Sequence, residues 1–170
     1  MDSRGKDRML DIGYSFEGKA LGRGFARRMR LRGDDARRQF EAGNFPEAIL
    51  AVQEALELNA KMIALATVGK YPREHVIDER RLSGFVKAVI EAATSADVTF
   101  RFLPEDLVRV FLLARFWSQM YPVVKYGIEE LGVAPQRIFG REEAELALHH
   151  LSQVSEIGPK LVDYFGPCVA

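Results

Sequence analysis

Side chains that can hold an anion gather in the second half of the chain, around a long glycine- and proline-containing connection. They are two arginines, two tyrosines and a lysine: Arg115, Tyr121, Lys125, Tyr126 and Arg141. Guanidinium and ammonium groups donate charge-assisted hydrogen bonds to phosphate and carboxylate oxygens. The group therefore predicts a ligand site for an anion, with phosphate or nucleotide as the first candidate. The structural alternative is that Arg115 pairs with a carboxylate, because a charge in an apolar helix needs a partner, while the tyrosines pack an interhelix corner.

The common catalytic motifs are missing from the sequence. It has no glycine-rich phosphate loop, no dinucleotide fingerprint and no serine elbow with a matching acid and histidine. One cysteine and three histidines do not readily make a zinc site. His149 and His150 are adjacent, so they point about 100° apart on a helix and cannot chelate one metal as histidines at i and i+4 do. We therefore expect neither a bound metal nor a cofactor.

The composition predicts a folded domain of ordinary size. The chain has 170 residues, of which 48% are apolar and 28% charged, and this balance is typical of a globular protein rather than a disordered one. The single cysteine, Cys168, excludes a disulfide within the chain, and a cytoplasmic location is expected. No apolar run approaches the roughly 20 residues that a membrane helix needs.

Charge is spread unevenly along the chain, although its total is zero. Residues 1–38 hold eleven lysines and arginines but six aspartates and glutamates, which leaves the remainder acidic. A basic segment of this kind can contact an anionic partner such as RNA. The alternative is that it packs on the acidic body of its own chain or of a neighbouring subunit.

The strongest helix signal lies between Gly43 and His75, and the other elements are expected to cover its apolar side. Asn44 is a suitable N-cap, and Glu47 could return a hydrogen bond to complete a capping box. Gly43 and Gly69 suit the left-handed residues that close helices. Apolar residues at steps of three and four define one buried face: Phe45, Ala48, Ile49, Val52, Ala55, Leu56, Met62, Ile63 and Ala66.

Two polar residues of this segment are assigned structural roles. Asn59 lies in register with the apolar face, where an amide without partners would cost roughly 1–3 kcal/mol. It should therefore bond another helix, a water or a ligand, and a structural hydrogen bond is expected. His75 marks the exit of the segment.

The remaining helices are expected at about residues 20–42, 75–93, 104–121 and 141–157. Gly33 could divide the first of them, with a new helix starting at Asp34. Pro122 should end the third helix, whose apolar residues nearly all round indicate either the domain centre or a subunit interface. Gly158 and Pro159 should interrupt the last one. Residues 98–102 are expected to be an extended linker. The pattern predicts an all-α, up-and-down antiparallel bundle of four to five helices.

The order and spacing of these landmarks resemble the HEPN family, in its archaeal and bacterial small helical branch. Its members are similar to AxxxFxxGNFxxAxxxxQEAxExxxKxxxxxxGxxPxxH, a pattern that spans residues 36–75 here. ARFWSQMYPVVKYG at 114–127 and IFGREEAELALHHLSQV at 138–154 resemble two later segments of the family. The resemblance covers about residues 34–157 and implies a homodimeric helical bundle. We place this domain at residues 34–170, preceded by a basic extension over residues 1–33 that is partly flexible or helical.

The same resemblance implies a nucleic-acid or nucleotide context. Family members include toxin ribonucleases and partners of small nucleotidyltransferases. The ribonucleases carry an arginine and, after four to six residues, a histidine, whereas Arg141 and His149 have seven residues between them. Eight steps rotate by about 80° on a helix, so the two side chains would not share one tight site. We expect a non-catalytic domain that binds nucleotide or RNA, or that docks on a minimal nucleotidyltransferase. The first alternative is a metal-independent ribonuclease that uses Arg141 and His149, which must then converge in one chain or across a dimer.

A second alternative is a protein-interaction module of the tetratricopeptide kind. The run GNFPEAILAVQEALELN at residues 43–59 resembles half of such a repeat. The repeat recurs every 34 residues, and no echo of it is found at Ile77, which lies 34 residues after Gly43. This alternative predicts a superhelical groove rather than a bundle.

Overall fold

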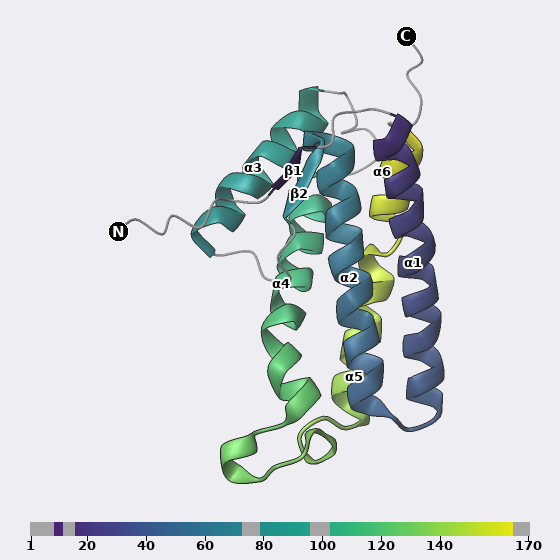
Figure 1. The fold of residues 1–170 in the computed structure, drawn as a ribbon, viewed down its shortest axis with the longest axis vertical. Helices are drawn as coiled ribbons and strands as arrows, with labels where there is room; N and C mark the ends of the chain where they lie inside the picture. The colour runs from purple at the N-terminus through teal and green to yellow at the C-terminus, as the bar shows by residue number, and fades with distance from the viewer. Residues whose placement is uncertain (1–8, 12–15, 73–78, 96–102, 165–170) are drawn as a thin grey trace.

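The described residues fold into a bundle of helices. The main helices run alternately up and down one long axis (Figure 1). The structure is a computed structural model that describes residues 9–11, 16–72, 79–95 and 103–164. Its α-helices are α1 Phe16–Glu41, α2 Phe45–Val68, α3 Glu79–Ser95, α4 Pro104–Tyr126, α5 Arg141–Val154 and α6 Ile157–Tyr164. The prediction of an all-α, up-and-down bundle is confirmed. The described residues hold one helix more than the five expected, because α6 follows the last predicted helix, α5, as a separate helix. The two helices form one column (Figure 1).

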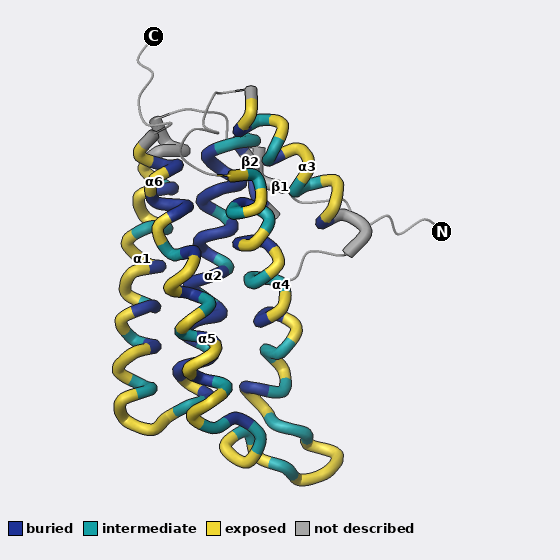
Figure 2. Tube along the Cα trace, turned by 180° about the vertical axis from the view of Figure 1, so that it is seen from behind, coloured by how far each residue is buried: buried dark blue, intermediate teal, exposed yellow. Residues whose placement is uncertain are grey.

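Helix α2 is the centre of the bundle. Every residue of α2 except Glu47 is buried or half-buried, and α1, α4, α5 and α6 all pack against it (Figure 2). Such burial is expected of a helix that is apolar nearly all round. The tetratricopeptide alternative is wrong, because units of a solenoid contact only their sequence neighbours, whereas α2 packs on helices that follow it by about a hundred residues.

The corner between α1 and α2 differs in one detail from the expected capping box. Gly43 has the left-handed φ of 79° that the sequence predicted. The side chain of Asn44, however, makes no cap to α2; its Nδ2 donates instead to Oε1 of Gln39, at 2.9 Å. The amide is thus turned back toward α1. The rings of Phe40 and Phe45, with centroids 5.7 Å apart, close the same corner.

Helix α1 continues without a break through Gly33, so the alternative of two separate helices is wrong. Met29 and Ala36, on either side of this glycine, are buried in the core, and Gly33 itself faces Leu151. Packing therefore holds the helical conformation where propensity alone is weak. The boundary that the sequence suggested between residues 33 and 34 lies inside this helix.

Helix α4 also extends past its predicted end. It begins at Pro104, as expected, and has two acidic residues in its first turn, but it includes Pro122 and ends at Tyr126. A proline inside a helix costs about 3 kcal/mol. Burial beyond it offsets this cost, since Val124 is only 1% exposed and packs in the core. The N–H of Gly127 closes the helix by donating to the carbonyl of Val123 at 2.8 Å.

Short elements complete the fold. Strands β1 (Met9–Asp11) and β2 (Lys70–Pro72) pair antiparallel near one end of α2. The connection after α4 contains the 3-10 helices η2 (Glu129–Leu131) and η3 (Pro135–Arg137). His75 and the predicted linker at residues 98–102 lie outside the described residues.

Asn59 ties α2 to the junction of α5 and α6. Its side chain is fully buried, its Nδ2 donates to the carbonyl of Val154 at 2.7 Å, and its Oδ1 accepts from the N–H of Gly158 at 2.9 Å. The helical conformation is interrupted between Val154 and Ile157, just before Gly158 and Pro159. These two residues fall in the first turn of α6, where a proline is tolerated.

Candidate functional site

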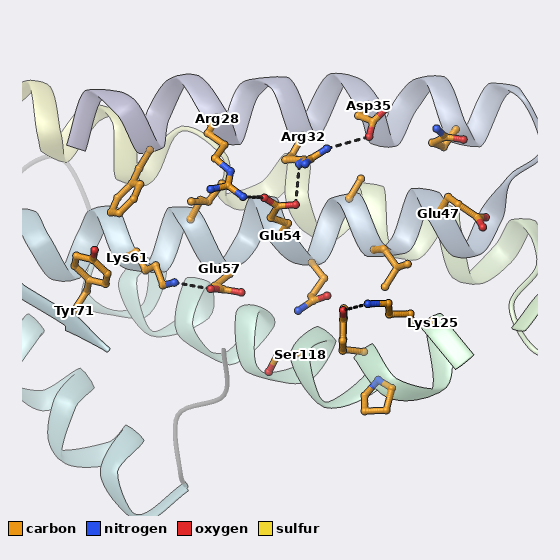
Figure 3. A pocket seen from close by; sticks show the side chains of 18 residues that line it. Arg28, Arg32, Asp35, Glu47, Glu54, Glu57, Lys61, Tyr71, Ser118 and Lys125 are labelled. Atoms are coloured by element: carbon orange, nitrogen blue, oxygen red, sulfur yellow. Dashed lines mark hydrogen bonds and ion pairs between the residues drawn. The ribbon is translucent and has the colours of Figure 1, made fainter. Parts of the chain in front are cut away.

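A pocket of about 740 Å³ lies along the side of α2 that faces between α1 and α4 (Figure 3). We call it the α2 pocket. Helix α2 forms its floor, α1 and α4 form its two walls, and Tyr71 of β2 lies at one end. The polar and charged residues that line it are Arg28, Arg32, Asp35, Gln39, Glu47, Gln53, Glu54, Glu57, Lys61, Ser118 and Lys125.

The α2 pocket is elongated and has apolar patches in its floor. Its lining on α2 runs from Glu47 to Lys61, which at a rise of about 1.5 Å per residue corresponds to roughly 21 Å. Leu50, Ala51 and Leu58 lie between these ends, and the small side chain of Ala51 deepens the floor. The shape suits an extended or helical segment that lies along α2.

Carboxylates of α2 and α1 bind most of the pocket's cations. Glu54 accepts from Nη2 of Arg28 at 2.5 Å and from Nε of Arg32 at 2.7 Å, and Arg32 also lies 3.5 Å from Asp35. One turn further along α2, Nζ of Lys61 lies 2.6 Å from Glu57. This last pair is an i,i+4 pair within α2. Its two side chains are only about 15% exposed, so it is shielded better than a surface pair.

Three of the five residues predicted to bind an anion come together at the C-terminal end of α4. Nζ of Lys125 donates to the phenol oxygen of Tyr121 at 2.7 Å and lies 5.1 Å and 5.2 Å from the ring centres of Tyr121 and Tyr126. The hydrogen bond to Tyr121, followed by that to Tyr126, raises the pKa of Lys125 above its ordinary value. Tyr121 and Lys125 line the α2 pocket.

The two predicted arginines lie apart from this cluster. Arg141 is at the first position of α5, where its guanidinium lies 4.9 Å above the ring of Phe40 and pairs with Glu145 at 3.2 Å. Arg115 is half-buried on α4, six residues before Tyr121, and six steps turn a helix by about 240°. The five residues therefore do not form one site within the chain.

Arg141 and His149 likewise do not meet within one chain. They are separated by about 12 Å along the axis of α5. Arg141 contacts the corner of α1 and α2, whereas the exposed ring of His149 lies 3.0 Å from Nε2 of Gln153. A cation and a proton-transfer group must converge on one phosphate for ribonuclease chemistry.

His150 has a partner that sequence reasoning missed. Nε1 of Trp117 in α4 donates to Nδ1 of His150 in α5, at 3.2 Å. Burial, and to a lesser extent the charge of His149, lowers the pKa of His150 below its ordinary value. The ring is therefore held neutral, with Nδ1 free to accept. No spacing in the sequence connects residues 33 positions apart on different helices.

The charged lining of the α2 pocket was also missed, although one signal could have indicated it. Glu47, Glu54 and Lys61 recur at intervals of seven on a mostly apolar helix. Such spacing places them on one side of α2 and marks a stripe that other helices leave accessible. The arginines on α1 that face them could not be identified without knowing how α1 packs.

The fold and the pocket define a class of protein: an all-α bundle with an elongated pocket beside its central helix. Comparison with protein families then identifies the chain, because residues 29–161, more than three quarters of it, match the model of the HEPN domain. The chain belongs to the HEPN domain family. Comparisons with curated proteins and with solved structures gave no significant match. Within the described residues, none of the helices has an apolar stretch long enough to cross a membrane.

Proposed function

We propose that this HEPN domain is a non-catalytic module that docks a partner protein in the α2 pocket. The partner class that the family resemblance implies is a minimal nucleotidyltransferase. The observation that carries the proposal is that the pocket is lined by equal numbers of positive and negative side chains, together with apolar residues in its floor.

Four cations and four carboxylates line the α2 pocket: Arg28, Arg32, Lys61 and Lys125, with Asp35, Glu47, Glu54 and Glu57. A nucleotide or an RNA strand brings only negative charge, so it would meet repulsion from the floor and would have to displace Glu54 from two arginines. A polypeptide brings both charges together with aliphatic side chains for Leu50, Ala51 and Leu58. Opposite charges that match across an interface give specificity and register. The balance therefore favours protein docking over nucleotide binding.

The separation of Arg141 from His149 supports a non-catalytic role. Neither side chain lines the α2 pocket, and each has its own local partners. The ribonuclease alternative now requires that a second copy of the chain bring an arginine to His149. RNA cleavage by the purified protein that disappears on His149→Ala would favour this alternative over docking.

The first prediction concerns complex formation with the nucleotidyltransferase encoded beside this protein's gene, if one is present. Lys125→Glu reverses a charge on the wall of the pocket and should weaken a co-purified complex at least about tenfold, which corresponds to 1.4 kcal/mol. Lys87→Glu is the matched control, because Lys87 is an exposed lysine on α3, outside the pocket. Affinities of the two variants are compared by titration calorimetry.

Equal affinities for Lys125→Glu and Lys87→Glu would contradict docking in this pocket. Titration of the isolated protein with ATP and with a short RNA tests the competing role. Micromolar binding of either ligand that is lost on Arg28→Gln and Arg32→Gln would show that the pocket takes an anion, and would overturn the proposal.

We also propose that the protein forms a homodimer, through the outer side of α4. Leu112 and Phe116, one turn apart on this helix, are 54% and 46% exposed. They are large apolar side chains on a helix that is apolar nearly all round, and an apolar surface of this kind indicates a protein contact.

A further inference from the structure

The outer side of α1 carries arginines that are neither in the α2 pocket nor in the core. Between residues 20 and 33 the chain has five arginines and no acidic residue. Arg28 and Arg32 turn toward the pocket and bind Glu54. The other three are Arg23, Arg27 and Arg30, and all three are exposed. We call these three residues the α1 arginine row.

The α1 arginine row is concentrated on one side of the helix. Steps of four and three residues keep Arg23, Arg27 and Arg30 within about 60° of one another, over a length of roughly 10 Å. No ion pair or hydrogen bond joins any of them to another residue in the described part of the chain. Two turns further on, by contrast, Arg37 pairs with Asp34 at 3.0 Å and Arg38 with Asp35 at 3.2 Å.

We propose that the α1 arginine row binds the phosphodiester backbone of a nucleic-acid duplex. Guanidinium groups bind phosphate oxygens through paired N–H donors. Three such groups along about 10 Å cover a stretch of about three nucleotides on one strand, whose axial rise is about 3.4 Å per nucleotide. The contact carries no base readout, so it positions the domain on a duplex without selecting a sequence.

This site is separate from docking in the α2 pocket and goes beyond it. The two surfaces use different residues of α1, and the carboxylates that make the pocket unfavourable for phosphate are absent from residues 20–33. A lipid surface is a weaker partner for the row, because core residues of the helix such as Met29 and Ala36 are buried in the bundle. Leu31, which is 58% exposed beside the row, is a single apolar side chain and does not make the broad apolar face that inserts into a membrane surface. Figure 2 shows the outer side of α1 as exposed from residue 20 onward.

The test uses the full chain and two short duplexes of the same sequence, one of RNA and one of DNA. Affinity is followed by fluorescence anisotropy between about 50 mM and about 200 mM salt. Each phosphate contact contributes about −0.9 to the slope of log K against log salt for B-DNA, so replacing the whole row by glutamine should make the slope shallower by about 2.7. Over that fourfold rise in salt, the wild type should lose about 40-fold more affinity than the triple variant.

Two matched double variants distinguish the effect of losing the α1 arginine row from the effect of losing the same amount of positive charge elsewhere on α1. Arg23→Gln with Arg27→Gln and Arg37→Gln with Arg38→Gln remove the same charge from the same helix, and glutamine keeps the helix propensity. Only the first pair should flatten the slope by about 1.8. Binding of both duplexes supports recognition of the backbone shared by RNA and DNA, and binding of RNA alone supports an RNA backbone as the source. Equal loss in both double variants, no binding at low salt, or binding only to phosphatidylserine vesicles would overturn the proposal.

Discussion

At the scale of single residues, Asn59 shows how one side chain sets the packing of three helices. From its position on α2, its side chain makes a hydrogen bond to a carbonyl at the end of α5 and another to an N–H at the start of α6. Sequence reasoning found this residue because a polar side chain interrupted an apolar stripe. Its partners, 95 and 99 residues further along the chain, could not be predicted from a local pattern.

Replacing Asn59 by leucine should destabilise the protein strongly. The change leaves the Val154 carbonyl and the Gly158 N–H buried without partners, and each such group costs about 1–3 kcal/mol. We expect a loss of roughly 3 kcal/mol in the free energy of unfolding, measured by urea denaturation. Gln53→Leu is the control, since Gln53 is another buried amide of α2 and makes no hydrogen bond to the described residues. A similar loss in both variants would contradict the role assigned to Asn59.

At the scale of elements, the hydrogen bond between Trp117 and His150 joins α4 to α5 and makes their contact sensitive to pH. The pKa of His150 is lowered in the folded protein below its ordinary value of 6.5. The folded state therefore binds fewer protons than the unfolded state in the range between the two pKa values. The stabilisation is fully present above pH 6.5 and is lost as the pH falls through the lower, folded-state pKa.

Acidification should therefore weaken the contact between α4 and α5. Trp117 is the only tryptophan of the chain, so its fluorescence reports this contact directly. We expect a fluorescence change with a midpoint below pH 6.5, together with a lower melting temperature. His150→Gln removes the titrating group while keeping an acceptor, and should abolish the change; His149→Gln should retain most of it. A transition that survives in His150→Gln would assign the effect to another group.

The ends of elements were the least predictable part of the fold, because they depend on packing. The apolar stripe of α2 and the left-handed glycines at its two ends could be read from the sequence. Pro122 was expected to end α4, but burial of Val124 beyond it carries the helix to Tyr126.

The candidate site was predicted only in part for a similar reason. Tyr121, Lys125 and Tyr126 share one helix, whereas the position of Arg141 depends on how α5 meets the corner of α1 and α2.

At the scale of the whole molecule, the outer side of α4 supports the last prediction, which concerns assembly. Phe116→Asp places a charge in the proposed contact between two copies, and it should convert a dimer into a monomer in sedimentation velocity. Leu31→Asp makes the same kind of change on α1, where Leu31 is 58% exposed, and should leave the dimer intact. A wild-type protein that sediments as a monomer at every concentration would rule out the homodimer.

The central position of α2 also has a consequence for synthesis on the ribosome. The hairpin of α1 and α2 can form as soon as residue 68 has left the exit tunnel, but one side of α2 is covered only by α5 and α6. Until those late helices emerge, the apolar residues and the amide of Asn59 on that side have no protein partner. The nascent chain should therefore remain a substrate for chaperones until α6 has emerged, and reach its cooperative fold only then.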